Sequence, residues 1–191
     1  MVSAPSGAGK STLVERIRQT HNLFYSVSCT TRAPRGGEID GEDYRFLSDA
    51  DFRERVGKGD FLEHAQVHGD HYGTLREPIV TNLKEGKDVL IDIDTQGAAA
   101  IRNCGDPLVR NALADVFIMP PDLEELRKRL LKRGTETGEQ IDSRLATAVR
   151  EMEHWREYRY TIISGSVEED LQRFRQIMEA ESYLSRRLIE K

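Results

Sequence analysis

Near its start the chain reads Ala4-Pro5-Ser6-Gly7-Ala8-Gly9-Lys10-Ser11, a pattern that predicts a phosphate-binding loop leading into a helix. Glycine permits left-handed backbone and close approach, so backbone N–H groups in the loop can converge on phosphate oxygens. The helix expected from 11 to about 20 points its positive end at the same anion. Lys10 is expected to neutralise β- and γ-phosphates, and the Ser11 hydroxyl to ligate Mg²⁺.

The loop departs from the usual pattern at one position, because Ala4 replaces the first glycine. Only three residues precede Ala4, so the first strand is expected to be very short. The alternative interpretation is a glycine-rich turn between a strand and a helix that binds no ligand. The run Gly9-Lys10-Ser11-Thr12, followed by a helix with periodic apolar residues, favours the phosphate loop.

Length and composition favour a single globular domain with a well-solvated surface. The chain has 191 residues, of which 38% are hydrophobic and 32% charged, and its net charge is −5. No overall basic field therefore indicates nucleic acid or an anionic membrane as a partner. Cys29 and Cys104 form neither a disulfide framework nor a metal-ligand pattern, which suits a reducing cytoplasm. No run reaches membrane-spanning length, and no signal-peptide apolar segment precedes the loop.

Strand and helix patterns alternate, which predicts a parallel sheet covered by helices. Strands are expected at 1–4, 24–28, 88–94, 114–119 and 160–164, and helices at 11–20, 122–132, 139–155 and 167–187. The apolar run 88–94 ends in acidic residues, as is typical of a buried strand whose carboxyl end meets a ligand.

Two stretches interrupt this alternation. Residues 32–78 are rich in Gly, Asp and aromatic residues, and predict an insertion of short strands and turns with a helix near 49–56. The polar stretch 133–138 resembles a mobile lid between two helices.

A cluster of arginines opens the insertion. Arg32 and Arg35 flank Pro34, which constrains the local backbone. Two guanidinium groups at this spacing can converge on one phosphate, and Tyr44 can add a hydroxyl. The alternative is that these arginines lie on the surface and pair with neighbouring acids. The spacing alone leaves both interpretations open.

With these motifs in order, the chain resembles the guanylate kinases, of the nucleoside monophosphate kinase group, over essentially its whole length. The matching stretches lie at 3–12, 28–35, 41–44, 61–65, 72–74, 92–97, 120–121, 133–135 and 144–145. The resemblance implies an α/β P-loop nucleoside-monophosphate-kinase fold in one domain over 1–191. Its core would comprise 1–31 and 79–191, its mixed α+β GMP-binding insertion about 32–78, and its small lid about 133–141.

The resemblance also implies the residues that hold GMP. They are Ser28, Arg32, Arg35 and Tyr44 for the phosphate and Glu63, Thr74 and Asp94 for the guanine base, with Tyr72 also among the GMP-binding residues. The chemistry of the base agrees, because guanine presents N1–H and N2–H₂ as donors to a carboxylate, and a threonine hydroxyl can donate to O6. Adenine reverses that edge, and buried mismatched polar groups are costly. Without the resemblance, Glu63 is interpreted as a solvated strand residue.

The donor side is implied in the same way. ATP and its phosphates would be held by Ser6, Gly7, Ala8, Gly9, Lys10, Ser11, Thr12 and Arg129. The catalytic residues would be Lys10, Arg32, Arg133 and Arg144, which place positive charge around the transferring group. Ser11 would ligate Mg²⁺, and Asp92, two residues before Asp94 and on the same strand face, would approach it through water.

Two of these assignments have structural alternatives, because Asp92 could bond loop N–H groups and Arg129 could be a solvated helix residue. The turn Ser164-Gly165-Ser166 stands where the family carries an Asn-Asp type turn beside adenine. That puts side-chain contacts to adenine in doubt and leaves backbone contacts open.

The function expected is Mg-ATP-dependent phosphorylation of GMP, and of dGMP, to the diphosphate by direct in-line transfer, in purine nucleotide metabolism. Closure of the insertion and the lid would exclude water. The partners expected are ATP and GMP, without nucleic acid or membrane, in a cytoplasmic monomer or homodimer. One alternative is a catalytically silent guanylate-kinase-like module that binds phosphopeptides. The other is a kinase for another nucleoside monophosphate or for a ribose phosphate.

Overall fold

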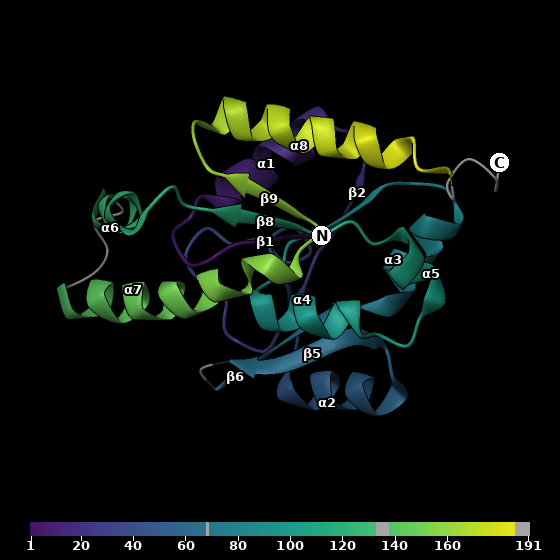
Figure 1. The fold of residues 1–191 in the computed structure, drawn as a ribbon. Helices are drawn as coiled ribbons and strands as arrows, with labels where there is room; N and C mark the ends of the chain where they lie inside the picture. Colours follow the sequence, from purple (N-terminus) through teal and green to yellow (C-terminus); the bar gives the residue numbers. More distant parts are fainter. Residues whose placement is uncertain (68, 133–137, 186–191) are drawn as a thin grey trace. The chain divides into compact units, whose positions relative to one another are not determined.

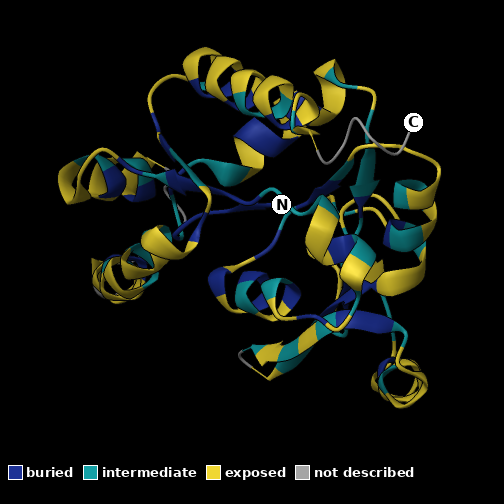
Figure 2. Ribbon diagram, turned by 45° about the vertical axis from the view of Figure 1, so that its right-hand side comes forward, coloured by how far each residue is buried: buried dark blue, intermediate teal, exposed yellow. Residues whose placement is uncertain are grey.

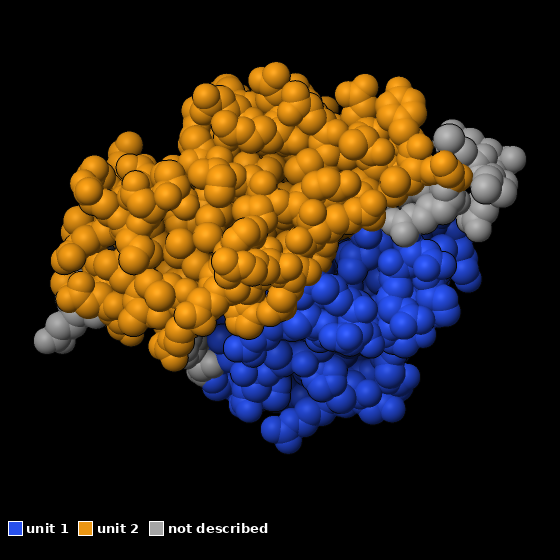
Figure 3. Space-filling model, viewed as in Figure 1, with its two compact units in different colours: residues 1, 22–113 blue, residues 2–21, 114–191 orange. Residues whose placement is uncertain are grey.

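The structure is a computed structural model that describes residues 1–67, 69–132 and 138–185. The chain forms two compact units, shown in different colours in Figure 3. Unit 1 comprises residue 1 and residues 22–113, and unit 2 comprises residues 2–21 and 114–191. No helix of the described residues is both long and apolar enough to cross a membrane.

Unit 2 is built on a parallel sheet with the strand order β1-β8-β9. Its strands are β1 (Val2–Ser3), β8 (Val116–Met119) and β9 (Tyr160–Ile163), with Val2 beside Val116 and Val116 beside Tyr160. The central strand β8 is a continuous apolar run, as expected for a strand covered on both faces. Phe117 and Ile118 are accordingly buried, and Pro120 follows the strand.

Helices cover both faces of this sheet. Figure 1 shows α1 and α8 on one side and α7 on the other. The helices are α1 (Lys10–Thr20), α6 (Leu123–Lys132), α7 (Gly138–Met152) with the 3₁₀ turn η1 (Glu153–Glu157), and α8 (Val167–Ser182). Leu13, Val14 and Ile17 form the buried stripe of α1. A capping box of Ser166 and Glu169 starts α8.

Unit 1 contains a parallel pair and a second, mixed sheet. The pair joins β2 (Phe24–Ser26) to β7 (Val89–Ile91). The mixed sheet has the order β4-β3-β6-β5, from β3 (Cys29–Thr30), β4 (Arg45–Phe46), β5 (Phe61–Val67) and β6 (Asp70–Leu75). Its buried cluster holds Cys29, Phe52, Phe61 and Leu75, with the rings of Phe52 and Phe61 stacked at 4.7 Å.

Four helices complete unit 1, namely α2 (Asp49–Lys58), α3 (Arg76–Lys84), α4 (Thr95–Arg102) and α5 (Pro107–Ala112). Helices α2 and α4 lie on opposite faces of the β5–β6 hairpin (Figure 1). Buried residues gather along the strands and along one face of each covering helix (Figure 2).

The predicted strands and the helix near 49–56 are confirmed, whereas α3, α4 and α5 were not predicted. These helices are short, with 9, 8 and 6 residues, so each offers little length in which a periodic apolar pattern can be recognised. The strand expected over 88–94 ends at Ile91, which corrects the placement of Asp92 and Asp94 on it, because both follow the strand. The strand cannot continue through Asp94 because Asp94 is the N-cap of α4, and its side chain accepts the Gly97 N–H.

The division into a core, an insertion over 32–78 and a lid over 133–141 stays a prediction. Residues 133–137 of that lid, including Arg133, lie outside the described residues.

Candidate nucleotide-binding sites

The loop between β1 and α1 in unit 2 has the backbone that the glycine pattern predicts. Gly7 and Gly9 adopt φ of +88° and +98°, both left-handed. The Ala8 N–H donates to the Pro5 carbonyl at 3.1 Å, which closes the turn. Gly9 is the N-cap of α1, so Lys10 stands on the first turn of the helix. The loop therefore delivers Lys10 and Ser11 at the positive end of a helix.

Gly7 has a second reason to be glycine, because a Cβ there would lie 2.8 Å from Leu130 Cδ2 and 3.1 Å from Leu126 Cδ1. We expect Gly7→Ala to lower the free energy of unfolding by about 2–3 kcal/mol, from left-handed strain together with crowding. Denaturant unfolding measures this. The control is Gly57→Ala, where nothing lies within 4 Å and the helix gains propensity. Equal stability of the two variants would contradict the argument.

Arg129 on α6 joins the loop to two other parts of unit 2. Its Nη1 donates to the Ala8 carbonyl at 3.1 Å and to Ser164 Oγ at 2.9 Å, and its Nε donates to Glu125 at 3.0 Å. Ser164 Oγ in turn donates to the buried Asp170 at 2.9 Å. Arg129 is thus half-buried and three times bonded, unlike a solvated helix residue. Its contact with ATP stays a prediction.

Helix α7 also reaches the loop, through Glu151. The Ser6 N–H donates to Glu151 Oε2 at 3.0 Å. Arg144 lies exposed on the same helix. Glu151 is not predicted from the sequence, because nothing local marks one glutamate of this helix as a partner of the loop.

In unit 1, Arg32 is held by an ion pair with Glu38. Its Nη1 and Nη2 donate to the two carboxylate oxygens at 2.7 and 2.5 Å, and only 9% of the Arg32 side chain is exposed. The Arg35 N–H donates to the same carboxylate at 2.7 Å. The alternative interpretation of surface arginines paired with acids therefore holds at Arg32 for the pairing, but not for the surface position. The Arg35 side chain is exposed.

Two tyrosines complete this cluster. The Arg32 guanidinium carbon lies 5.0 Å from the centroid of the Tyr44 ring, and the Tyr44 and Tyr72 rings meet edge-on at 6.1 Å. Burial raises the pKa of the Tyr44 hydroxyl, and the nearby carboxylate of Asp92 raises it further. Arg32, Tyr44 and Tyr72, predicted from separate stretches, are therefore neighbours, with Asp92 close by.

Arg32 and Glu38 shift each other's pKa in the direction that keeps both side chains charged. Hydrogen bonding from Arg32 lowers the pKa of Glu38 to about 2, with the Arg35 N–H contributing, and Glu38 raises the pKa of Arg32. Both side chains are therefore charged at any pH at which the protein works.

The predicted base-binding residues also lie together in unit 1. Glu63 on β5 faces Thr74 on β6, and the Thr74 hydroxyl donates to Glu63 Oε1 at 2.6 Å. A Cβ on Gly97 would lie 2.6 Å from the Ile93 side chain and 3.3 Å from Glu63 Oε2, so glycine at the start of α4 keeps room mainly for Ile93 and also for this oxygen. Burial raises the pKa of Glu63, and the charge of Asp94 adds to that rise.

This geometry differs from the expectation at one atom, because the Thr74 hydroxyl that was expected to donate to guanine O6 donates to Glu63 here. The interpretation of Glu63 as a solvated strand residue does not hold, since it is mostly buried. Ser28 lies half-buried at the start of β3, where its carbonyl accepts the Arg45 N–H at 2.8 Å.

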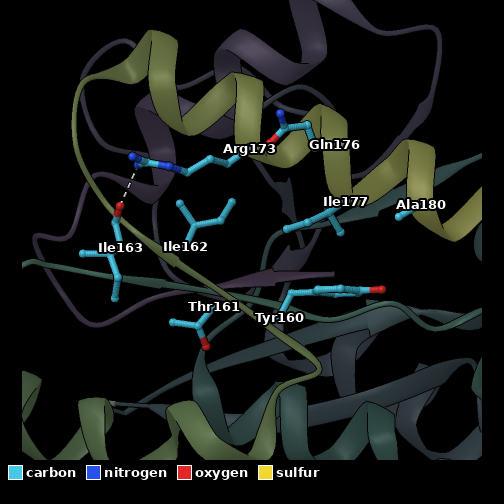
Figure 4. A pocket seen from close by; sticks show the side chains of 8 residues that line it. All are labelled: Tyr160, Thr161, Ile162, Ile163, Arg173, Gln176, Ile177 and Ala180. Carbon is cyan, nitrogen blue, oxygen red and sulfur yellow. Dashed lines mark hydrogen bonds between the residues drawn. The ribbon is translucent and has the colours of Figure 1, made fainter.

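A surface groove elsewhere in unit 2 holds none of the predicted residues. It lies between β9 and α8 and is lined by Tyr160, Thr161, Ile162, Ile163, Arg173, Gln176, Ile177 and Ala180 (Figure 4). Arg173 crosses one end of it to bond the Ile163 carbonyl at 2.8 Å.

Comparison with known proteins agrees with this geometry. The guanylate kinase family model matches residues 1–181. A guanylate kinase of Clostridium perfringens is 40% identical over 182 residues, covering 95% of this chain and 82% of the relative. One of Salmonella paratyphi A is 46% identical over 184 residues, covering 95% and 86%. The crystal structure of guanylate kinase from Anaplasma phagocytophilum superposes with a TM-score of 0.77 at 34% identity, covering 97% of this chain and 86% of that one.

The phosphate loop and the sheet architecture define a P-loop kinase with the nucleoside-monophosphate-kinase fold. Within that class, the chain belongs to the guanylate kinase family and is an enzyme of that family.

Proposed function

We propose that this chain transfers the γ-phosphoryl group of ATP to GMP, and to dGMP, to give the nucleoside diphosphate. The observation that carries the proposal is the arrangement within unit 1. Arg32, Tyr44 and Tyr72 are neighbours, and the Tyr44 hydroxyl lies near the carboxylate of Asp92. The mostly buried carboxylate of Glu63 lies near Asp94. The guanidinium and the tyrosine hydroxyls suit a phosphate monoester, and the two carboxylates suit a base with adjacent donors.

The base preference follows from the charge of Glu63. An ionised carboxylate only accepts hydrogen bonds, and Glu63 already accepts the Thr74 hydroxyl on one oxygen. Its other oxygen and the carboxylate of Asp94 are suited to accept N1–H and N2–H₂ of guanine. Adenine has no donor at either position, so the carboxylates would lose water without gaining a partner.

The donor site proposed is the loop of unit 2. The Ser6 and Ala8 N–H groups already bond Glu151 and Pro5. Backbone N–H groups of Gly7 and of Gly9 to Thr12 would surround the phosphates of ATP, Lys10 would neutralise them, and Arg129 would hold the loop by its Ala8 carbonyl. Arg133 and Arg144 remain candidates for catalysis. Phosphoryl transfer needs mainly positioning and positive charge, so no covalent enzyme intermediate is required.

The donor set fits Mg²⁺ carried by ATP. The described residues place no group of three or more His, Cys, Asp or Glu side chains for a metal. Mg²⁺ commonly binds substrate phosphates and water with only one or two protein ligands, and does not need a protein cage. The Ser11 hydroxyl would be one such ligand, and Asp92 would act through water. The metal supplies charge that stabilises the transferring phosphoryl group.

A coupled assay that offers GMP, dGMP, AMP, CMP and UMP with Mg-ATP tests the function. We expect turnover with GMP and dGMP and at least about 10³-fold lower kcat/KM for AMP, because the unpaired carboxylates would penalise adenine. Comparable turnover of another monophosphate would replace the substrate assignment. A folded protein that binds GMP but turns over none of them would favour the silent phosphopeptide-binding alternative.

A further inference from the structure

Glu38 owes its position to a tight turn. The Glu38 N–H donates to the Arg35 carbonyl at 3.1 Å, and Gly37 adopts φ of +89°. A turn of this type needs a positive φ at its third residue, which glycine provides without strain. The turn reverses the chain after Pro34 and returns the Glu38 carboxylate to Arg32.

The Glu38 carboxylate accepts hydrogen bonds from the terminal nitrogens of the Arg32 guanidinium. Both terminal nitrogens donate to Glu38, and Nη1 also donates to the Ala33 carbonyl at 2.9 Å. A guanidinium has five N–H donors in a fixed planar fork. Three of them are thus directed into the protein's own loop, and these bonds leave the Nε donor and the second Nη2 donor unused.

These bonds restrict the conformations that the Arg32 side chain can adopt. A free arginine side chain loses considerable conformational freedom when it binds a ligand, and prior ordering reduces that cost. The rings of Tyr44 and Phe46 lie 5.0 and 5.8 Å from the guanidinium carbon and add to this ordering. Arg32 is therefore ordered in the unliganded protein by Glu38, Ala33 and two aromatic side chains.

We propose that Glu38 is a positioning residue for GMP: its carboxylate holds the outer end of Arg32 so that the remaining N–H donors face the substrate phosphate. This inference rests on the proposed function. It assigns Glu38 a role without contact to substrate, and it makes the Arg32–Glu38 pair a permanent part of the site that GMP does not displace.

The test compares Glu38→Gln with Glu42→Gln, which removes an exposed charge from the same loop. We expect Glu38→Gln to raise KM for GMP by about 10- to 100-fold, the loss associated with disrupting a charge-assisted bidentate pair. KM for ATP and the melting temperature should stay close to wild type. Glu38→Asp keeps the charge on a shorter stem and should fall between the two.

A binding measurement separates positioning from a general loosening of the loop. Guanosine lacks the phosphate, so its inhibition constant should be the same for wild type and Glu38→Gln, whereas GMP binding weakens. Equal weakening of guanosine and GMP would overturn the inference. A lower KM for GMP in Glu38→Gln would overturn it too, because Glu38 would then compete with the phosphate.

If Glu38→Gln does not fold, the same comparison is made with Glu38→Asp, for which an unchanged KM for GMP overturns the inference. Wild-type protein without GMP kinase activity contradicts the proposed function, whereas active wild type with an unaffected Glu38→Gln variant contradicts only the positioning role.

Discussion

Replacing Lys10 by Ala is expected to lower kcat by about 10²–10³-fold or more while leaving the fold intact, because it removes a positive charge that counters the transition state. Lys10 stands on the first turn of α1, directly after the left-handed Gly9. No other residue of the loop carries a cationic side chain, so its neighbours cannot substitute for it. Steady-state kinetics with GMP and Mg-ATP measure the effect.

The control for Lys10→Ala is Lys58→Ala on α2, where the side chain is exposed and pairs with Glu54. Circular dichroism and thermal unfolding establish that both variants are folded. Near-normal turnover by folded Lys10→Ala would show that this loop does not bind the transferred phosphate. Loss of turnover in Lys58→Ala would show that the assay responds to surface charge in general.

Replacing Glu63 by Gln is the second large effect expected. One carboxylate oxygen becomes an amide N–H₂ donor that faces the donors of guanine, so kcat/KM for GMP should fall by about 10- to 1,000-fold, or roughly 1.4–4 kcal/mol. KM for ATP should change little. Glu54→Gln on the exposed face of α2 is the matched control. Weakened ATP binding with unchanged GMP kinetics would place Glu63 in the donor site instead.

The raised pKa of Glu63 gives this prediction a pH dependence with a definite sign. As pH falls through that pKa, Glu63 takes a proton and loses an acceptor, so GMP binding weakens at a higher pH than for an exposed glutamate. Calorimetric titration of GMP between pH 5 and 8 measures it. The substrate phosphate titrates in both proteins, so only the difference between wild type and Glu63→Gln reports on Glu63.

Stability should follow the opposite trend. The folded-state pKa of Glu63 lies above its unfolded value, so the destabilisation from its buried charge is present above the folded pKa and is relieved as pH falls through it. Glu63→Gln removes that charge and keeps an oxygen for the Thr74 hydroxyl. At neutral pH it should therefore unfold at the same or a higher temperature than wild type, which separates lost function from lost folding.

The sequence predicts those features of the structure that are set by residues close together along the chain. The two glycines of the phosphate loop, the apolar run of β8 and the periodic stripe of α1 each act within one short segment. Helices α3, α4 and α5 are short and are not predicted by such local patterns. Asp94 and Asp106 cap α4 and α5, but a cap is difficult to distinguish from a polar residue that ends a strand. The N-cap of α3 is Leu75, which makes no side-chain capping bond.

The sequence by itself determined that a phosphate loop feeds α1, that an α/β sheet carries it, and that Arg32, Tyr44, Glu63, Thr74 and Asp94 belong to candidate site motifs. Only the tertiary structure decided their partners. Arg129 bonds Ala8 across 121 residues, and Glu151 bonds Ser6 across 145. Leu130 fills the space that a Gly7 side chain would need. Such contacts depend on how helices dock on a sheet, so no local pattern contains them. Even Glu38, six residues from Arg32, reaches it only because the turn at Gly37 reverses the chain.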